Sequence, residues 1–255
     1  AAIAKDAKDW TLDEQKAVAE DIAKNGTASP AYAKAKAAMD VGTTWSVKLT
    51  NGETMNYRII GINHDNFADG SGKAGLTFLT TSTGIKSRMS SSCWFDDGGW
   101  EASELRVKMN SGEIWNLMPS EFQSKVKTVS KQTVSTPRND RSEIGTTDPA
   151  NKDAAVTATS DKLFLLSYSE IVETPCSWYS DWPWFGKEGT QYEAFKGKVT
   201  ENSNSNSAIA LGSDWWERSG NPKYPSMCLN VNGHGDPLEE SNPLSSRCVC
   251  PAWCF

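Results

Sequence analysis

The sequence predicts an α+β protein with mostly antiparallel strands, and three observations lead to that class. Helix and strand signals are grouped along the chain instead of alternating, which argues against a parallel βαβ arrangement. Asn51-Gly52 separates two alternating apolar stretches, as the turn of a β-hairpin does. A chain of 255 residues, 38% of them apolar, can bury a sizeable core. We expect a helical appendage over residues 1–41 and one larger domain over residues 42–255.

The appendage carries two helix signals. Thr11 and Glu14 fit a capping box at the start of one helix, and Asn25-Gly26 supplies its stop. Ser29-Pro30 then begins a second, alanine-rich helix that reaches Met39. Because large apolar residues are few here, we expect this segment to pack on the main domain as a small accessory.

The main domain opens with strands. Trp45, Val47 and Leu49 alternate with polar residues before the Asn51-Gly52 turn, and residues 75–81 predict a further strand. Asp65 and Asp69 lie between these strands. Their stretch lacks the regular ligand spacing and closing glutamate of a calcium loop, so we interpret it as a simple turn.

Helices and loops follow in the middle of the chain. Ser103 is a helix cap, and a second helix is predicted over residues 119–129. Residues 137–161 are polar and predict an exposed loop, whereas the apolar run 162–168 predicts a buried strand. Residues 191–198 predict a last short helix.

Composition restricts the classes of function. The 26 basic and 32 acidic residues give a net charge of −6 without a basic stripe, which disfavours nucleic acid as a partner. No apolar run has membrane-spanning length, so no membrane insertion is expected. The six cysteines lack the spacing of a redox or zinc site, and His64 and His234 have no evident ligand partners. We therefore expect no metal and no cofactor.

Residues 215–255 are the most informative segment. Trp215, Trp216 and Trp253 are expected to pack inside, while the guanidinium group of Arg218 is expected to hold backbone carbonyls. Between these anchors lies an irregular polar stretch. Two apolar anchors around such a stretch are typical of a scaffold that presents a recognition surface.

Two aromatic clusters have the composition of protein-binding loops, in which rigid rings alternate with small polar residues. Core packing is the alternative role for the same rings. The candidate contact residues in these clusters are Trp94, Phe95, Asp96, Asp97, Trp178, Tyr179, Asp181 and Trp182.

Five motifs together carry a family resemblance. They are Trp-Trp-x-Arg-Ser at 215–219, Asn-Val-Asn-x-x-Gly at 230–235, Pro-Ala-x-x-Phe at 251–255, Trp-x-x-Ser-x-Leu-Arg-x-x-x-Asn at 100–110 and Phe-Leu-Leu-Ser-Tyr-Ser-Glu at 164–170. From about residue 42 onward, the chain resembles bacterial surface and prophage domains with a C-type-lectin-like fold. These are similar to the variable ligand-binding proteins that retroelements diversify, and more distantly to formylglycine-generating enzymes. The resemblance implies a location on a cell surface, outside the cell or on a phage virion.

The resemblance also implies where ligands bind, because variation in that family lies between the Arg-Ser bracket and the final strand. The final strand departs from the expected Gly-Val-Arg-Pro with Cys248-Val249-Cys250-Pro251, and the calcium motifs of sugar-binding lectins do not occur. The contact positions implied are Asn221, Tyr224, Ser226, Met227, Cys228, Asn230, Asn232, His234, Asp236, Leu238, Glu239, Glu240, Ser241, Asn242, Leu244, Ser245 and Arg247. We hypothesise that this stretch and the two aromatic clusters form one diversified surface.

Two functions of different classes remain. The first is a non-catalytic binding or adhesion domain for a protein or cell-surface ligand. The alternative is a copper oxidase like the formylglycine-generating enzymes, which needs a thiol pair; Cys248 with Cys250, or Cys250 with Cys254, alternate onto one face of a strand. A purely structural part of a virion or fibre is the third option, and the sequence leaves the oligomeric state open.

Overall fold

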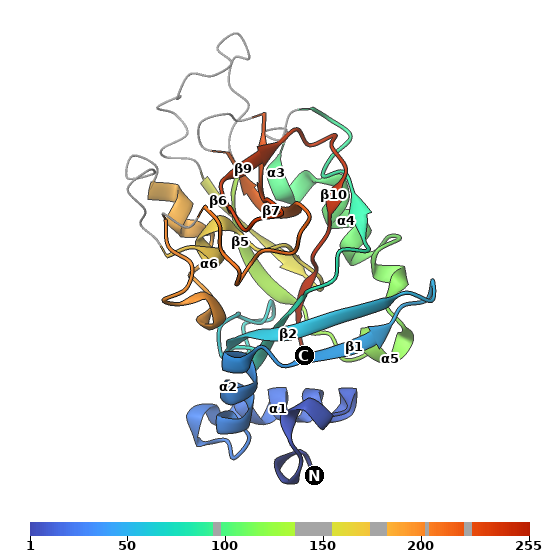
Figure 1. Ribbon diagram of the computed structural model, residues 1–255, viewed down its shortest axis with the longest axis vertical. Helices are drawn as coiled ribbons and strands as arrows, with labels where there is room; N and C mark the ends of the chain where they lie inside the picture. Colours follow the sequence, from blue (N-terminus) through green and yellow to red (C-terminus); the bar gives the residue numbers. More distant parts are fainter. Residues whose placement is uncertain (94–97, 136–154, 174–182, 202–203, 222–225) are drawn as a thin grey trace.

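The computed structural model describes residues 1–93, 98–135, 155–173, 183–201, 204–221 and 226–255 (Figure 1). The helices are α1 (Leu12–Asn25), α2 (Tyr32–Val41), α3 (Gly99–Ala102), α4 (Glu104–Asn110), α5 (Ser120–Gln123) and α6 (Tyr168–Ile171). The strands are β1 (Thr44–Lys48), β2 (Thr54–Ile62), β3 (Leu76–Thr80), β4 (Lys86–Ser87), β5 (Val129–Ser135), β6 (Ala155–Asp161), β7 (Trp215–Gly220), β8 (Cys228–Val231), β9 (Glu239–Ser241), β10 (Arg247–Cys248) and β11 (Ala252–Cys254). All pairs among these strands are antiparallel except β10 with β7, which confirms the α+β class with mostly antiparallel pairing.

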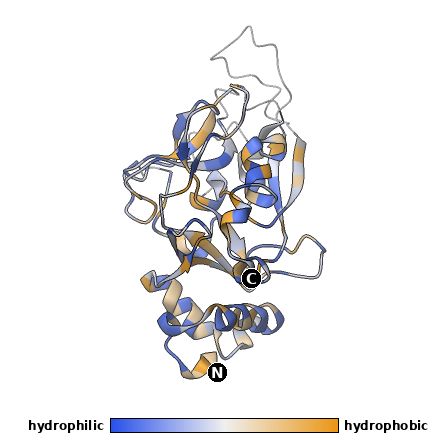
Figure 2. Ribbon diagram, turned by 90° about the vertical axis from the view of Figure 1, so that its right-hand side faces the viewer, coloured by the Kyte–Doolittle hydropathy of each residue, from blue (hydrophilic) through white to orange (hydrophobic). Residues whose placement is uncertain are grey.

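The N-terminal helices form a layer beneath the first sheet (Figures 1 and 2). As predicted, the hydroxyl of Thr11 caps α1 by accepting a hydrogen bond from the Glu14 backbone N–H, and Gly26 with φ +56° ends the helix. The Trp10 ring stacks on Trp45 with centroids 6.2 Å apart. Trp10 and Trp45 belong to the same hydrophobic core as the strands, so the helices pack directly on the main domain.

The first sheet has the order β1-β2-β3-β11 and contains the predicted hairpin. β1 and β2 pair over five residues around the Asn51-Gly52 turn, and the predicted strand at 75–81 is β3. The C-terminal strand β11 pairs with β3, with Trp253 opposite Phe78. The end of the chain therefore lies beside strands from its first third.

The second sheet has the order β4-β10-β7-β8-β9, with β7 at its centre. Every residue of β7 is buried except Gly220. The predicted burial of three tryptophans is confirmed: Trp215, Trp216 and Trp253 are at most 1% exposed. The indole N–H of Trp216 donates to the Ser87 carbonyl at 2.9 Å, which ties β7 to the segment that carries β4.

Three predictions for the middle of the chain are wrong. The helix expected over 119–129 is only the single turn α5, because Val129 begins strand β5. Residues 155–161, expected in an exposed loop, form β6 and pair with β5 over seven residues. Residues 162–167 contain one isolated bridge, Phe164 to Ala252, instead of a strand. In the first two cases tertiary pairing overrides the local pattern.

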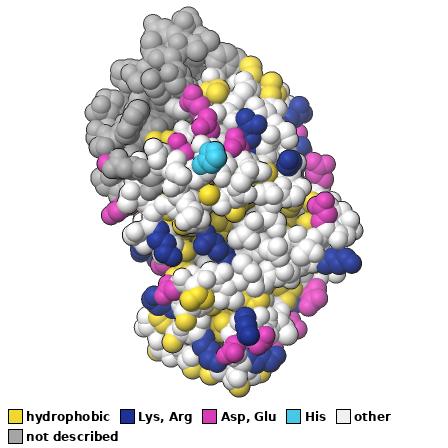
Figure 3. Space-filling view, viewed as in Figure 1, with side chains coloured by type: hydrophobic (Ala, Val, Ile, Leu, Met, Phe, Trp, Pro, Cys, Tyr) yellow, Lys and Arg dark blue, Asp and Glu magenta, His cyan; other side chains and the backbone are white. Residues whose placement is uncertain are grey.

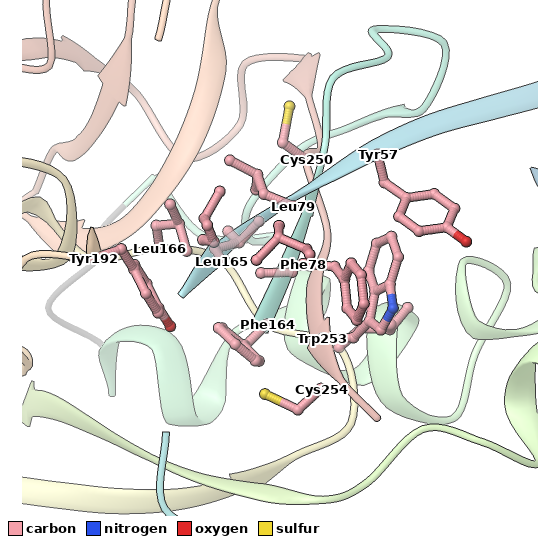
Figure 4. Close-up of a cluster of buried hydrophobic side chains, with 14 of the residues drawn as sticks. Tyr57, Phe78, Leu79, Phe164, Leu165, Leu166, Tyr192, Cys250, Trp253 and Cys254 are labelled. Carbon is pink, nitrogen blue, oxygen red and sulfur yellow. The ribbon is translucent and has the colours of Figure 1, made fainter. Parts of the chain in front are cut away.

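The main hydrophobic core includes side chains of β3, β11 and the segment 162–167. Figure 4 shows Phe78, Phe164, Leu165 and Trp253 packed together there, and each is fully buried. The helix expected over 191–198 reduces to a 3-10 turn at Glu193–Phe195, which places Tyr192 against this core. The remaining 3-10 helices are Ala2–Ala4, Ala7–Asp9, Gly26–Ala28, Trp115–Leu117 and Pro183–Glu188.

Candidate functional site

The segment from residue 226 to 247 forms part of the surface, and we call its exposed and half-exposed residues the β8–β10 face. His234, Glu239 and Leu244 are exposed, Leu244 at 47%. Figure 3 shows a histidine surrounded by acidic side chains on the side of the molecule that carries β7 and β9. The β8–β10 face consists of Ser226, Met227, Asn232, Gly233, His234, Asp236, Leu238, Glu239, Glu240, Asn242, Leu244, Ser245, Ser246 and Arg247.

Asparagine and aspartate side chains fix the backbone of this face. The Asn232 side-chain oxygen accepts hydrogen bonds from the backbone N–H groups of His234 and Asp236, both at 3.0 Å. Asp236 accepts from Leu238 N–H at 2.9 Å in the same manner. Such bonds between Asn or Asp side chains and nearby backbone N–H groups stabilise a turn. They do not depend on the identity of the other side chains in the turn. The exposed side chains of His234, Glu239 and Leu244 take no part in these bonds, so they are not required to hold the loop.

Four of the predicted contact residues lie in the interior instead. Cys228 and Asn230 are fully buried because β8 is an inner strand, covered by β7 on one side and β9 on the other. Ser241 is 3% exposed and donates a hydrogen bond to the Asn230 side-chain oxygen at 2.9 Å. Asn221 is 9% exposed and bonds to the Glu240 carboxylate. The expectation that these four residues lie on an exposed surface is wrong.

The remaining predicted contacts lie outside the described residues. They are Tyr224 in the C-terminal segment, Trp94, Phe95, Asp96 and Asp97 in the first aromatic cluster, and Trp178, Tyr179, Asp181 and Trp182 in the second. The hypothesis that the three regions form one surface therefore stays a prediction.

Arg218 is the centre of a buried frame and lies in β7, the central strand of the sheet that carries this face. Its guanidinium group donates to the carbonyl oxygens of Leu165 at 2.8 Å, Gln132 at 3.0 Å and Glu188 at 2.7 Å. The predicted role of Arg218 in holding backbone carbonyls is thus confirmed. The group also forms an ion pair with the carboxylate of Glu170, which the sequence did not indicate. Arg218 therefore joins β7 to β5 and α6.

Lys131 extends this frame into a buried charge network, which we define as Asp65, Lys131, Glu170, Tyr192 and Arg218. The Lys131 ammonium group contacts the Asp65 carboxylate at 2.6 Å and also the Glu170 carboxylate, and these three side chains are at most 3% exposed. The Tyr192 hydroxyl donates to Asp65 at 2.8 Å. The charges of the network balance, since two cations face two carboxylates.

The network shifts the pKa values of its members. Burial alone would raise the pKa of the Asp65 carboxyl, but Lys131 and neighbouring groups lower it to about 2. Burial would likewise raise the pKa of Glu170, and Arg218 with Lys131 holds it below its ordinary value. Although burial disfavours the charged amine, Asp65 and Glu170 raise the pKa of Lys131. The four charged groups therefore stabilise one another in their ionised forms.

Two further acids next to Arg218 behave differently. Burial raises the pKa of Glu188 to about 7, although Val134 N–H and the Ser219 hydroxyl donate to its carboxyl group. Burial also raises the pKa of Glu217 well above its ordinary value, and neither of its carboxyl oxygens has a hydrogen-bond partner in the described structure. These two carboxyl groups favour the neutral form in the interior.

Two members of the network, Asp65 and Glu170, also belong to a candidate metal-ligand set. Within the described part of the chain, His64, Asp65 and Glu170 bring one ligand atom each within 4.8 Å of one another. The Lys131 ammonium group, however, contacts both carboxylates of this set. A metal ion would have to displace that cation, so the donor set does not favour a metal centre.

Among the residues that the structure describes, the cysteines of the C-terminal segment do not all gather into one site. Figure 4 shows Cys250 and Cys254 at opposite ends of the core cluster. Their spacing places them on one face, yet four residues of extended chain span about 13 Å, which is too far for one metal ion. Burial raises the pKa of Cys250 and of Cys254 well above the ordinary value. The thiols of Cys248 and Cys250 lie beside the carbonyls of Thr83 and Ser82, which are consecutive residues. Of the two thiol pairs that the oxidase alternative allows, only Cys248 with Cys250 therefore lies close together.

Sequence reasoning missed Asp65 and Lys131 as partners. The sequence contained one signal for Lys131. It alternates along β5 with Val129 and Thr133, and all three residues are buried on the same face of the strand. Asp65 was treated as a turn residue, but it lies 4% exposed behind the end of β2. Only the fold shows that these segments meet.

Residues 74–254 match the family model described as a domain of unknown function (DUF6273), and this match covers β3 to β11, including both the β8–β10 face and most of the charge network. Searches of curated proteins and of solved structures gave no significant match. Within the described residues, no helix has the length and apolarity of a membrane span. Because the family model matches well over half of the sequence, the chain belongs to the DUF6273 family.

Proposed function

We propose that this protein is a non-catalytic ligand-binding domain that presents the β8–β10 face on a C-type-lectin-like scaffold. In this proposal a retroelement diversifies the face, and the partner is a protein or another ligand on a cell surface. The domain itself is carried on a bacterial surface or a phage particle.

One observation carries the proposal: within the described residues, the bonds that hold the segment come from buried or half-buried Asn, Asp and Ser side chains, whereas the exposed side chains of His234, Glu239 and Leu244 take no part in them. Asn230 and Ser241 bond to each other in the interior, and Asn232 fixes the loop backbone. His234 and Leu244 point to solvent without such a role among the bonds described above. A surface built in this way can accept many side chains without loss of the fold.

The buried frame around Arg218 favours tight binding of a ligand to the β8–β10 face. Arg218 connects β7 to two other elements through buried bonds, so the sheet that carries the face is fixed in place. A preorganised surface loses little conformational entropy on binding. A few anchor side chains can then supply most of the affinity.

The present side chains suit a partner with basic groups. Asp236, Glu239 and Glu240 are acidic, and Leu244 offers an exposed apolar contact. Arg247 is the basic residue of the face, and it lies 3.5 Å from the Asp214 carboxylate, which offsets its charge. Complementary charge speeds association and gives specificity.

Sequencing the gene in many related isolates tests the proposal. Substitutions should concentrate at outward positions such as His234, Glu239 and Leu244, as adenine-directed changes in their codons. The interior residues Asn230 and Ser241 in the same segment are the matched control and should stay constant. Substitutions spread evenly over both groups, or a segment identical in all isolates, would contradict a diversified binding surface.

A further inference from the structure

We propose that Lys131 and Asp65 condense into an intramolecular isopeptide bond, with Glu170 as the group that transfers the protons. The product is an amide between the Lys131 side-chain nitrogen and the Asp65 side-chain carbon. It joins β5 to the segment that follows β2. This inference is independent of the proposed binding function.

The two reacting groups are already in contact and shielded from water. Lys131 Nζ lies 2.6 Å from Oδ1 of Asp65, and both side chains are 3% exposed. The Phe164 ring covers the amine, with its centroid 4.3 Å from Nζ. Holding two reactants in one geometry replaces a bimolecular encounter and lowers the entropic part of the barrier. A dry site also prevents competing hydrolysis.

The other oxygen of the Asp65 carboxyl group has two hydrogen-bond donors. Thr77 Oγ1 donates to Oδ2 at 2.6 Å, and the Tyr192 hydroxyl donates to the same atom at 2.8 Å. When an amine adds to the carboxyl carbon, negative charge develops on this oxygen. Fixed donors at that point stabilise the tetrahedral intermediate, as an oxyanion hole does.

Glu170 is the proton acceptor for the amine. Its Oε2 atom accepts a hydrogen bond from Lys131 Nζ, while its Oε1 atom accepts from Arg218 and from the Ser167 backbone N–H. Arg218 favours the ionised form of Glu170, which is the form that takes up a proton. A general base in direct contact with the proton it removes satisfies the geometric requirement for this role.

The atoms of the step balance without a further reactant. Glu170 takes one proton from the Lys131 ammonium group, and the nitrogen lone pair forms the C–N bond to Asp65. Oδ1 then leaves as water after it receives that proton and a second one from the nitrogen. The net change is ammonium plus carboxylate to amide plus one water, and no oxidant or reductant is needed.

The product also removes a burial penalty. The interior holds four charges in this network, and taking each of them out of water costs desolvation free energy. Condensation neutralises Lys131 and Asp65 together. Glu170 and Arg218 remain as a balanced ion pair, so the charge of the interior stays at zero.

The intact mass of the purified full chain, measured after denaturation, tests the bond. We expect a mass lower than the sequence mass by one water. Trypsin should then yield residues 59–73 joined to residues 128–138, because an amidated Lys131 is not a cleavage site. An unmodified mass would overturn the proposal and leave a buried ion pair. Water loss in an unlinked 59–73 peptide, from a succinimide at Asp69-Gly70, would overturn it as well.

Three variants separate the roles. Asp65→Asn should lose ammonia instead of water, since the same carbon is attacked. Lys131→Arg keeps the positive charge but should retain the full sequence mass. Glu170→Gln should remain largely unlinked while its circular dichroism stays folded; linkage as complete as in the wild type would overturn the role of Glu170. The wild-type mass decides the bond itself even if a variant fails to fold.

Discussion

Replacement of Arg218 by methionine tests the buried frame most directly. The Arg218 side chain is fully buried and bonds to three carbonyl oxygens and to the Glu170 carboxylate. Methionine has a similar length but no donor. In the variant, the Glu170 carboxylate loses one of its cationic partners. The three carbonyl oxygens lose a hydrogen-bond donor in a site that water does not reach.

The magnitude follows from these lost partners. Breaking a buried ion pair by removing one member costs about 3–5 kcal/mol, and each buried carbonyl left unpaired adds up to about 1–3 kcal/mol. Part of this cost is recovered by relaxation and by protonation of Glu170. We expect the free energy of unfolding to fall by about 4 kcal/mol, which is a large share of the roughly 5–15 kcal/mol of a typical domain.

Urea unfolding followed by tryptophan fluorescence measures the change, with two controls. Arg218→Lys keeps the positive charge but lacks the planar guanidinium group. Its free energy of unfolding should therefore lie between those of the wild type and the methionine variant. Arg88→Met removes an arginine whose ion pair with Glu104 is solvent-exposed, so it should cost less than about 1 kcal/mol. If Arg218→Met costs no more than Arg88→Met, Arg218 does not hold the frame.

Two further predictions concern the packing of α1 and the pH dependence of stability. Gly75→Ala places a methyl group 1.9 Å from the Ala19 carbonyl oxygen in α1 and should lower the urea midpoint of unfolding. The control Gly84→Ala meets only the flexible Glu53 side chain, at 3.2 Å, and should leave the midpoint unchanged. Equal midpoints for the two variants would contradict the close packing of α1. Because burial raises the pKa of Glu188 from 4.5 to about 7, the folded state binds more protons than the unfolded state between these values. Its contribution is full below about pH 4.5 and lost by about pH 7, on the order of 3 kcal/mol. Glu188→Gln should flatten that slope in urea titrations at stepped pH, and an unchanged slope would refute the assignment.

Short-range chemistry made much of the fold predictable from sequence. The Thr11 cap, the Asn51-Gly52 turn and the Ser103 cap each satisfy backbone groups within a few residues, so their patterns can be recognised locally. The Arg218 fork was also predictable, because a guanidinium group between buried tryptophans must find acceptors. These signals depend little on the rest of the chain.

Long-range pairing was not predictable in the same way. The sequence of β6 is rich in small and polar residues, and only its register with β5 makes it a strand. Cys228 and Asn230 lie in a polar segment and therefore suggested a surface, but β8 is enclosed by strands on both sides. The alternation of Val129, Lys131 and Thr133 marks Lys131 as an inward residue. No local pattern could name Asp65 and Glu170 as its partners.

The elements that the charge network connects have a physical consequence for β7, the central strand of the sheet that carries the β8–β10 face. Asp65 follows β2 of the first sheet, Lys131 lies in β5, Glu170 in α6 and Arg218 in β7 of the second sheet. The network therefore joins the two larger sheets, the β5–β6 pair and α6. Buried ion pairs contribute less to stability than apolar packing of the same volume, but misplacing one charge is costly. Such a network therefore selects one arrangement of β7 against alternatives. The binding scaffold proposed above requires that kind of specificity, because apolar packing alone tolerates shifts that surface substitutions induce.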